Sequence, residues 1–306
     1  MILHDLLVWL GGQRFGLVFL SLLATVISLL AADERQAKVL HVGTSGSLIA
    51  ADESGTEKGA LDALESLIKD ETRLNIKIDR QNGWRELADK MAKSQLALGI
   101  FRGYEFAWAS ENNRHLKPLV LAINGKRYST VSVVARRTHP AKDFAGLQDQ
   151  SLSIPDTGQR EPRLFIDRNS RANGKSPEKF FSKISSPHNV EEALDDVVDG
   201  VVQATVVDQT VLDAYKRRKP GRFERLKEVA RSQPFPPTVV AYNDRILDEA
   251  SVRQIRDGLL GAAAKEKHQM TLSLFHWTGF EQVPADFDQV LAKTRKAYPP
   301  PPTSTR

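Results

Sequence analysis

The feature that most constrains the fold is an alternation of short apolar runs and amphipathic stretches near the start of the chain. Three apolar runs have the composition of strands: 39–43, 74–79 and 96–101. The two stretches between them, 57–70 and 84–91, place apolar residues at helical spacing. A strand–helix–strand repeat of this length predicts parallel strands joined by crossover helices, and therefore an α/β fold.

The rest of the chain continues the same pattern. Further strands are expected at 118–123, 130–136, 201–207 and 238–242, and further helices at 209–216 and 251–264. One more helix is expected to begin after Asn189, which can cap it with Glu192 three residues on, and to end at Gly200.

Two segments interrupt the pattern and indicate where the chain passes between two lobes. Asn124-Gly125 is a turn signal, and the three prolines of segment 232–238 exclude both a helix and a central strand. If the chain crosses twice between two lobes, one lobe is built from two separate sequence segments and the other from a single continuous segment. This is the arrangement of a hinged cleft.

We therefore predict a two-lobed α/β fold, each lobe a mostly parallel sheet flanked by helices, with a cleft at a two-strand hinge. The predicted parts are lobe 1 (37–128 plus 238–298), lobe 2 (129–237) and a disordered Pro/Ser/Thr-rich tail (299–306).

The N-terminal 32 residues read as a targeting segment. Arg14 is followed by sixteen uncharged residues, Phe15 to Leu30, and then by Ala31-Ala32. This order predicts a secretory signal removed after Ala32. An uncleaved membrane anchor is the alternative, because Leu30 is a poor residue at the −3 position and the apolar run nearly reaches spanning length. Either reading predicts an exported, periplasmic protein whose membrane contact is limited to this segment.

The composition excludes several classes of function. The chain has no cysteine, which rules out thiol nucleophiles, cysteine-ligated metals and disulfides. The net charge of +5 is mild and no basic stripe is interleaved with aromatics, so no nucleic-acid partner is expected. No HExxH, G-x-S-x-G or phosphate-binding P-loop motif is present. We therefore expect no metal, no cofactor and no enzyme.

Candidate ligand-binding residues follow the predicted strands, because ligands of open α/β sheets bind beyond the carboxyl ends of strands. An arginine there can hold a carboxylate or phosphate with two parallel N–H bonds, and a helix beginning after residue 155 would add backbone N–H groups. The candidates at these strand ends are Ser45, Ser47, Trp84, Arg102, Tyr104, Asp156, Thr157, Arg160 and Asp208.

Most of these candidates also have a structural interpretation. Asp208 stands where a helix N-cap belongs, and Trp84 leads the apolar stripe of a helix. Tyr104 and Phe106 alternate with Glu105, a pattern that also fits the core. Arg160 is equally compatible with a solvated side chain, and His188 with a loop hydrogen bond.

Four segments of the chain together resemble a known family. They are "GWRELADKMAKSQLALGIFRGYEFAWA" (83–109), "SLSIPDTGQREPRLFID" (151–167), "SPHNVEEALDDVVDGVVQATVVDQTVLDAY" (186–215) and "RSQPFPPTVVAYN" (231–243). Their order and spacing resemble the PhnD-like substrate-binding proteins of phosphate, phosphite and phosphonate ABC transporters, over residues 39–285. The resemblance implies a type II periplasmic binding fold and a monomeric receptor that closes on a small oxyanion and delivers it to an ABC permease.

The resemblance also implies roles for particular residues. Trp84 matches an aromatic used against the ligand, and His188 and Asp208 match the family's His and Asp. Tyr128-Ser129-Thr130 matches a hinge region whose hydroxyls, here those of Ser129 and Thr130, contact the ligand.

The chain departs from the family pattern at two places. It has Arg102-Gly103 where the family has Gly-Pro, and Asp156 to Arg160 where the family has a Ser/Thr-rich cluster. We infer that the backbone cradle for an anion is kept while its hydroxyl lining is replaced by charge from Arg102 and Arg160. The ligand is then a small anion that need not be a phosphonate.

Three functions are compatible with the sequence. The first is an exported solute-binding receptor for an ABC importer. The second is a membrane-anchored ligand-sensing or interaction module with the same fold and no transport role. The third, an enzyme, would need an acid–base pair such as His188 with Asp208.

Overall fold

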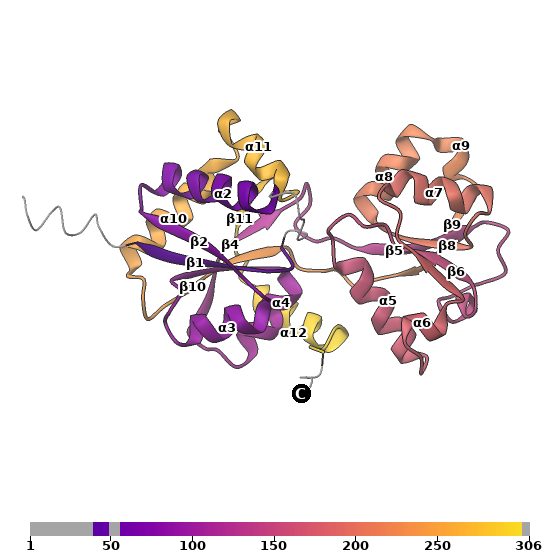
Figure 1. Cartoon of the computed structure of the whole chain (residues 1–306), viewed down its shortest axis with the longest axis horizontal. Coiled ribbons are helices and arrows are strands. Elements are labelled where there is room, and N and C mark those ends of the chain that lie inside the picture. Colours follow the sequence, from indigo (N-terminus) through magenta and orange to yellow (C-terminus); the bar gives the residue numbers. More distant parts are fainter. Residues whose placement is uncertain (1–38, 49–55, 302–306) are drawn as a thin grey trace, which may run out of the picture.

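The computed structural model describes residues 39–48 and 56–301, which form two sheets with helices packed on both faces of each (Figure 1). The predicted signal or anchor at 1–32 lies outside the described residues, as do residues 302–306 of the predicted tail. The first residues of that tail are described, and the Pro301 carbonyl accepts a hydrogen bond from Arg85 Nη2. Within the described part, no helix is long and apolar enough to cross a membrane.

The first sheet has six strands in the order β11-β4-β10-β3-β1-β2. Their bounds are β1 (Leu40–Ser45), β2 (Ile76–Gln81), β3 (Leu98–Phe101), β4 (Leu116–Ile123), β10 (Thr238–Asn243) and β11 (Gly279–Gln282). We call this sheet and its helices lobe 1. Helices α2, α10 and α11 lie on one face, and α3, α4 and α12 on the other (Figure 1). These helices are α2 (Thr56–Thr72), α3 (Trp84–Ala92), α4 (Gly103–Glu111), α10 (Glu249–Ala262), α11 (Glu266–Leu274) and α12 (Phe287–Ala297).

The second sheet has five strands in the order β7-β6-β8-β5-β9. Their bounds are β5 (Val131–Arg136), β6 (Ser151–Ser153), β7 (Lys183–Ser185), β8 (Ala204–Asp208) and β9 (Leu226–Arg231). We call this sheet and its helices lobe 2. Its helices are α5 (Glu161–Ala172), α6 (Pro177–Phe180), α7 (Val190–Asp199), α8 (Gln209–Arg218) and α9 (Pro220–Phe223), with a short 3₁₀ turn at Ala145–Leu147.

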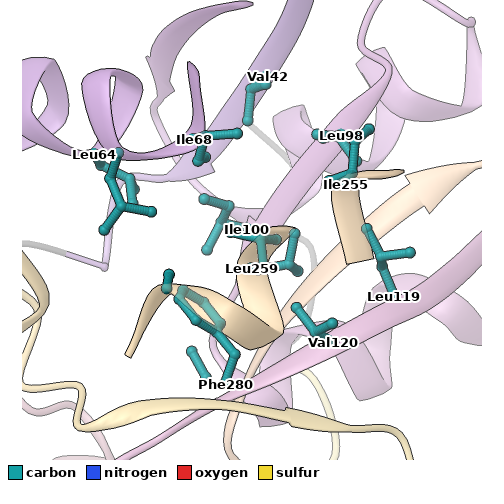
Figure 2. Packing of buried hydrophobic residues seen from close by; sticks show 14 of the residues in the cluster. Val42, Leu64, Ile68, Leu98, Ile100, Leu119, Val120, Ile255, Leu259 and Phe280 are labelled. Carbon is teal, nitrogen blue, oxygen red and sulfur yellow. The ribbon is translucent and has the colours of Figure 1, made fainter. Parts of the chain in front are cut away.

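The core of lobe 1 shows why its strands read as continuous apolar runs. Figure 2 shows side chains of β1, β3 and β4 meeting those of α2 and α10, with Ile100 and Leu259 near the centre. Both are fully buried, as is Val42. A sheet covered by helices on both faces buries both sides of its central strands, which selects near-continuous apolar sequence over alternation.

The sheets are mixed, which corrects the prediction that each is mostly parallel. In lobe 1, β1 pairs in parallel with β2 and β3, whereas β10 is antiparallel to both β3 and β4, and β11 is antiparallel to β4. The reason is the hinge: the chain leaves lobe 1 through β4 and returns through β10, and these neighbouring strands must run in opposite directions. The two-lobed α/β class itself is confirmed.

The hinge consists of the two chain segments between the lobes, 124–130 and 232–237. They run side by side, since Ser129 and Phe235 form an antiparallel bridge with N–O distances of 3.3 and 2.8 Å. Figure 1 shows these connections as the narrow join between the two sheets.

Candidate functional site

A polar pocket of about 100 Å³ lies at the hinge and is lined by both lobes. Lobe 1 contributes Arg102 from the end of β3, and lobe 2 contributes Asp208 from the end of β8. The side chains that give the pocket its polar character are those of Arg102, Asn124, Lys126, Arg127, Tyr128, Ser129, Gln159, Glu161, Asp208, Thr210, Thr238 and His276. The volume is small for a ligand pocket, so this space fits a ligand of only a few heavy atoms.

Arg102 is the N-cap residue of α4, and its guanidinium points into the pocket with little exposure to solvent. Its Nε donates to the Ser47 carbonyl at 2.9 Å, and its Nη2 donates to the Gly158 carbonyl of lobe 2 at 2.7 Å. Its Nη1 lies 3.4 Å from Glu161 Oε2. Burial lowers the pKa of this guanidinium, but the interactions with Glu161, Tyr104 and Glu105 together outweigh burial, so the net shift of the pKa is upward. Arg102 is therefore a fixed, fully charged donor that contacts both lobes.

A buried carboxylate, Glu105, supports the loop that holds Arg102. Glu105 accepts a hydrogen bond from the Ser47 hydroxyl at 2.6 Å and from the Arg102 backbone N–H at 3.3 Å. Ser45 Oγ lies 3.1 Å from Ser47 Oγ. Burial raises the pKa of Glu105, although these hydrogen bonds act in the opposite direction. Ser45 and Ser47 thus help to position Arg102 but do not line the pocket themselves.

The loop that follows β6 carries the predicted anion cradle. Helix α5 begins at Glu161, several residues later than the expected start after Pro155. Arg160 is exposed and makes no side-chain cap, and Asp156 is exposed while Thr157 is half-buried. The carboxylate at the helix start is Glu161, whose Oε2 accepts the backbone N–H of Arg160 at 3.0 Å.

Asp208 has both of the roles that the sequence left open. Its carboxylate caps α8 by accepting the Thr210 backbone N–H at 2.7 Å, and it lines the pocket. Burial raises the pKa of Asp208, the hydrogen bonds from Thr210 oppose this, and the negative charge of Glu161 adds to the rise.

The first hinge segment supplies cations to the pocket rim. Arg127 Nε donates to Glu281 at 2.6 Å, so its charge is already paired. Lys126 Nζ lies 3.5 Å from Asp213, and 65% of the Lys126 side chain is exposed. The Lys126 side chain can therefore leave Asp213 and turn toward a ligand with little loss of stability, because an exposed ion pair contributes little to the free energy of folding.

Several predicted site residues lie away from the pocket. Tyr104 is buried in the core, with its ring 5.0 Å from Trp108 and 6.4 Å from Phe235. Trp84 packs against Trp108, with the two ring centroids 5.4 Å apart. His188 is exposed, and Thr130 is half-buried with its carbonyl accepting the Gln209 N–H. Of the twelve candidates, Arg102, Ser129 and Asp208 are brought together around the pocket.

Sequence reasoning missed other pocket residues. Glu161 follows Arg160 directly, but no local pattern shows that it faces Arg102 across the cleft. His276 lines the pocket from the loop between α11 and β11, in a left-handed conformation with φ 57°. A positive φ at a non-glycine residue is uncommon, and only the three-dimensional structure reveals it. Within 39–48 and 56–301, no three His, Asp or Glu side chains are grouped so as to hold a metal ion.

Comparison with known proteins agrees with this architecture. A family model described as the periplasmic substrate-binding protein of phosphonate ABC transporters matches residues 47–287. No curated protein sequence matches the chain.

Among solved structures, XAC2383 from Xanthomonas citri bound to chloride is similar with a TM-score of 0.60 and 17% identity, covering 85% of this chain and 97% of that one. PhnD1 from Prochlorococcus marinus in complex with methylphosphonate has a TM-score of 0.55 and 13% identity, covering 85% and 97%. A binding-protein component of a phosphonate ABC transporter from Pseudomonas aeruginosa has a TM-score of 0.53 and 13% identity, covering 84% and 85%. At these identities the structural likeness concerns the fold alone.

Proposed function

We propose, from the premise that this chain belongs to the family of periplasmic substrate-binding proteins of phosphonate ABC transporters, that it captures a small oxyanion at the hinge pocket. The observation that carries the proposal is the placement of Arg102, a buried and positioned guanidinium, at a pocket lined by both lobes. A group that touches both lobes couples binding to closure, as a receptor of this kind requires.

The pocket also indicates the size and charge of the ligand. A volume of about 100 Å³ favours a ligand of phosphate or methylphosphonate size. Arg102 and Lys126 supply positive charge, whereas Glu161 and Asp208 supply negative charge, so a ligand that combines an oxyanion with a donor group fits best. We place the lobe boundaries at the two hinge segments, and propose a monomer that delivers this ligand unchanged to its permease.

A binding screen tests the proposal. The full-length protein is titrated with phosphate, phosphite, methylphosphonate, sulfate and acetate while its thermal unfolding is followed. A ligand at about one hundred times its Kd stabilises the folded state by roughly 2.7 kcal/mol, which is a clear rise in Tm. No rise with any of these anions in a folded protein would contradict the proposal.

Two variants locate the bound anion. Lys126→Gln removes a charge at the pocket rim and should weaken binding about two- to fivefold, as expected for an exposed charge. Lys117→Gln removes the same charge from the exposed face of β4 and should leave the Kd unchanged. Equal effects of the two variants would place the anion outside the pocket.

A second candidate function is a membrane-anchored sensing module, for which the N-terminal apolar run from Phe15 to Leu30 would supply the anchor. N-terminal sequencing of the protein recovered from its native cells separates the two. A terminus near Asp33 in the periplasmic fraction supports the exported receptor, and an intact N-terminus in the membrane fraction supports the anchored module.

A further inference from the structure

The two lobes are joined inside the pocket by a buried ion pair. Arg102 of lobe 1 approaches Glu161 of lobe 2 with Nη1 3.4 Å from Oε2, and its Nη2 donates to the Gly158 carbonyl at 2.7 Å. Only 10% of the Arg102 side chain and 16% of the Glu161 side chain are exposed. Water therefore screens this pair less than it screens pairs on the surface.

Glu161 stands where an anionic ligand would find its most favourable partners. It is the first residue of α5, a twelve-residue helix, and its Oε2 accepts the backbone N–H of Arg160 at 3.0 Å. The N-terminus of a helix carries partial positive charge that attracts anions. The carboxylate thus has both a guanidinium and a helix N-terminus as partners, which are the two kinds of partner that hold a bound oxyanion.

The guanidinium is held in place independently of Glu161. Ser47 accepts Arg102 Nε with its backbone carbonyl at 2.9 Å, and Glu105 holds the Ser47 hydroxyl at 2.6 Å. Loss of the Glu161 charge would therefore leave Arg102 in position and able to receive another anion.

A second contact keeps the same helix beside lobe 1. Arg168 Nε donates to the Ala297 carbonyl at the end of α12, at 3.0 Å. Glu161 and Arg168 are seven residues apart, so they lie on one face of α5. The Arg168 bond is exposed and has a neutral acceptor, whereas the Arg102–Glu161 pair is charged and largely shielded from solvent.

We propose that Glu161 is an internal counter-anion: it closes the lobes on Arg102 in the absence of ligand, and a ligand anion binds by displacing it. This inference rests on the proposed function for the identity of the displacing anion. It makes Glu161 a specificity-determining residue, because an anion that interacts with Arg102 no better than a carboxylate is excluded by competition.

The test compares Glu161→Gln with Glu192→Gln in the full-length protein. Glu192 lies exposed in the first turn of α7, in the same lobe, and the substitution changes the net charge equally. Small-angle scattering without ligand should show a larger radius of gyration for Glu161→Gln than for the unaltered protein or Glu192→Gln. Calorimetry with methylphosphonate and with phosphate should show a Kd lower by about tenfold for Glu161→Gln alone.

The outcomes separate the two proposals. If the unaltered protein binds an anion but Glu161→Gln neither expands nor binds more tightly, the counter-anion role is wrong and the receptor function stands. If Glu161→Gln expands while no form binds any anion, the internal closure is supported and the proposed oxyanion ligand is wrong.

Discussion

At the scale of single residues, Glu105 is a carboxylate kept in the core at the start of α4. Only 4% of the residue is exposed, and its partners are the Ser47 hydroxyl and the backbone N–H of Arg102. Burial raises the pKa of Glu105 in the folded state above its ordinary value, so the folded protein binds a proton there more readily than the unfolded chain does. The contribution of Glu105 to stability therefore falls as the pH rises from its ordinary pKa to its raised pKa.

The variant Glu105→Gln tests the direction of this pH dependence of stability, because glutamine is an uncharged analogue of the protonated glutamate side chain. We expect the variant to gain stability relative to the unaltered protein as the pH rises between those two pKa values, at no more than about 1.4 kcal/mol per pH unit. Urea denaturation over this range measures the difference. Glu111→Gln, at the half-exposed end of the same helix, serves as the control. A gain that shrinks with rising pH would contradict the prediction.

At the scale of elements, the contact between α4 and the second hinge segment depends on Gly103. A Cβ atom on Gly103 would lie 2.1 Å from the Pro236 carbonyl oxygen and 2.4 Å from that of Pro237. Both contacts are with backbone that the prolines hold stiff, so it cannot move aside easily. The helix that positions Arg102 therefore packs directly against the hinge at a residue with no side chain.

Gly103→Ala should accordingly destabilise the protein by roughly 1–3 kcal/mol, the usual cost of overpacking. Gly261→Ala is the matched control: Gly261 lies within α10 with nothing within 4 Å of the added methyl group. That change should stabilise by roughly 0.5–1 kcal/mol, because alanine favours helix over glycine. Chemical denaturation of both variants measures whether each substitution lowers or raises the free energy of unfolding. Equal effects would show that Gly103 has room for a side chain.

Elements with strong local signals were the ones predictable from sequence. Asn189 caps α7 by accepting the Glu191 N–H at 2.8 Å, and Gly200 ends that helix with φ 84°, as expected from their residue types. Strands β7, β9 and β11 were missed. All three are edge strands. Strand β9 mixes charged with apolar residues, β7 has only three residues and β11 only four, so tertiary pairing decides their structure.

The candidate site divides in the same way. Arg102 and Asp208 were predictable because each follows a buried strand, and strand ends determine where ligands bind. The pairing of Arg102 with Glu161 was not predictable, because it depends on how the hinge places one lobe against the other. The same applies to Tyr104, whose position after a strand suggested a ligand contact but whose ring packs against Trp108 and Phe235.

At the scale of the whole molecule, the hinge is packed as a core and both lobes contribute to it. One buried cluster includes Tyr104 and Trp108 of α4, Phe235 of the hinge, Tyr298 after α12, and Val131 at the start of β5. Phe235 is fully buried and stacks on Tyr298 with ring centroids 4.5 Å apart. Trp108 Nε1 donates to the Tyr298 carbonyl at 2.7 Å, which anchors the end of α12 to the same cluster.

This shared packing predicts that the two lobes lose stability together when the hinge is weakened. Phe235→Ala removes a fully buried ring and should lower the free energy of unfolding by roughly 3–5 kcal/mol. Because Phe235 belongs to a buried cluster with members from both lobes, hydrogen exchange of peptides from β3 and from β8 should accelerate together in this variant. Phe280→Ala is the control, since Phe280 packs in a cluster whose members all belong to lobe 1. It should accelerate exchange in β3 and leave β8 protected. If Phe235→Ala instead acts on one lobe only, the hinge is a passive connection and ligand-driven closure must depend on contacts within the pocket, beginning with Arg102.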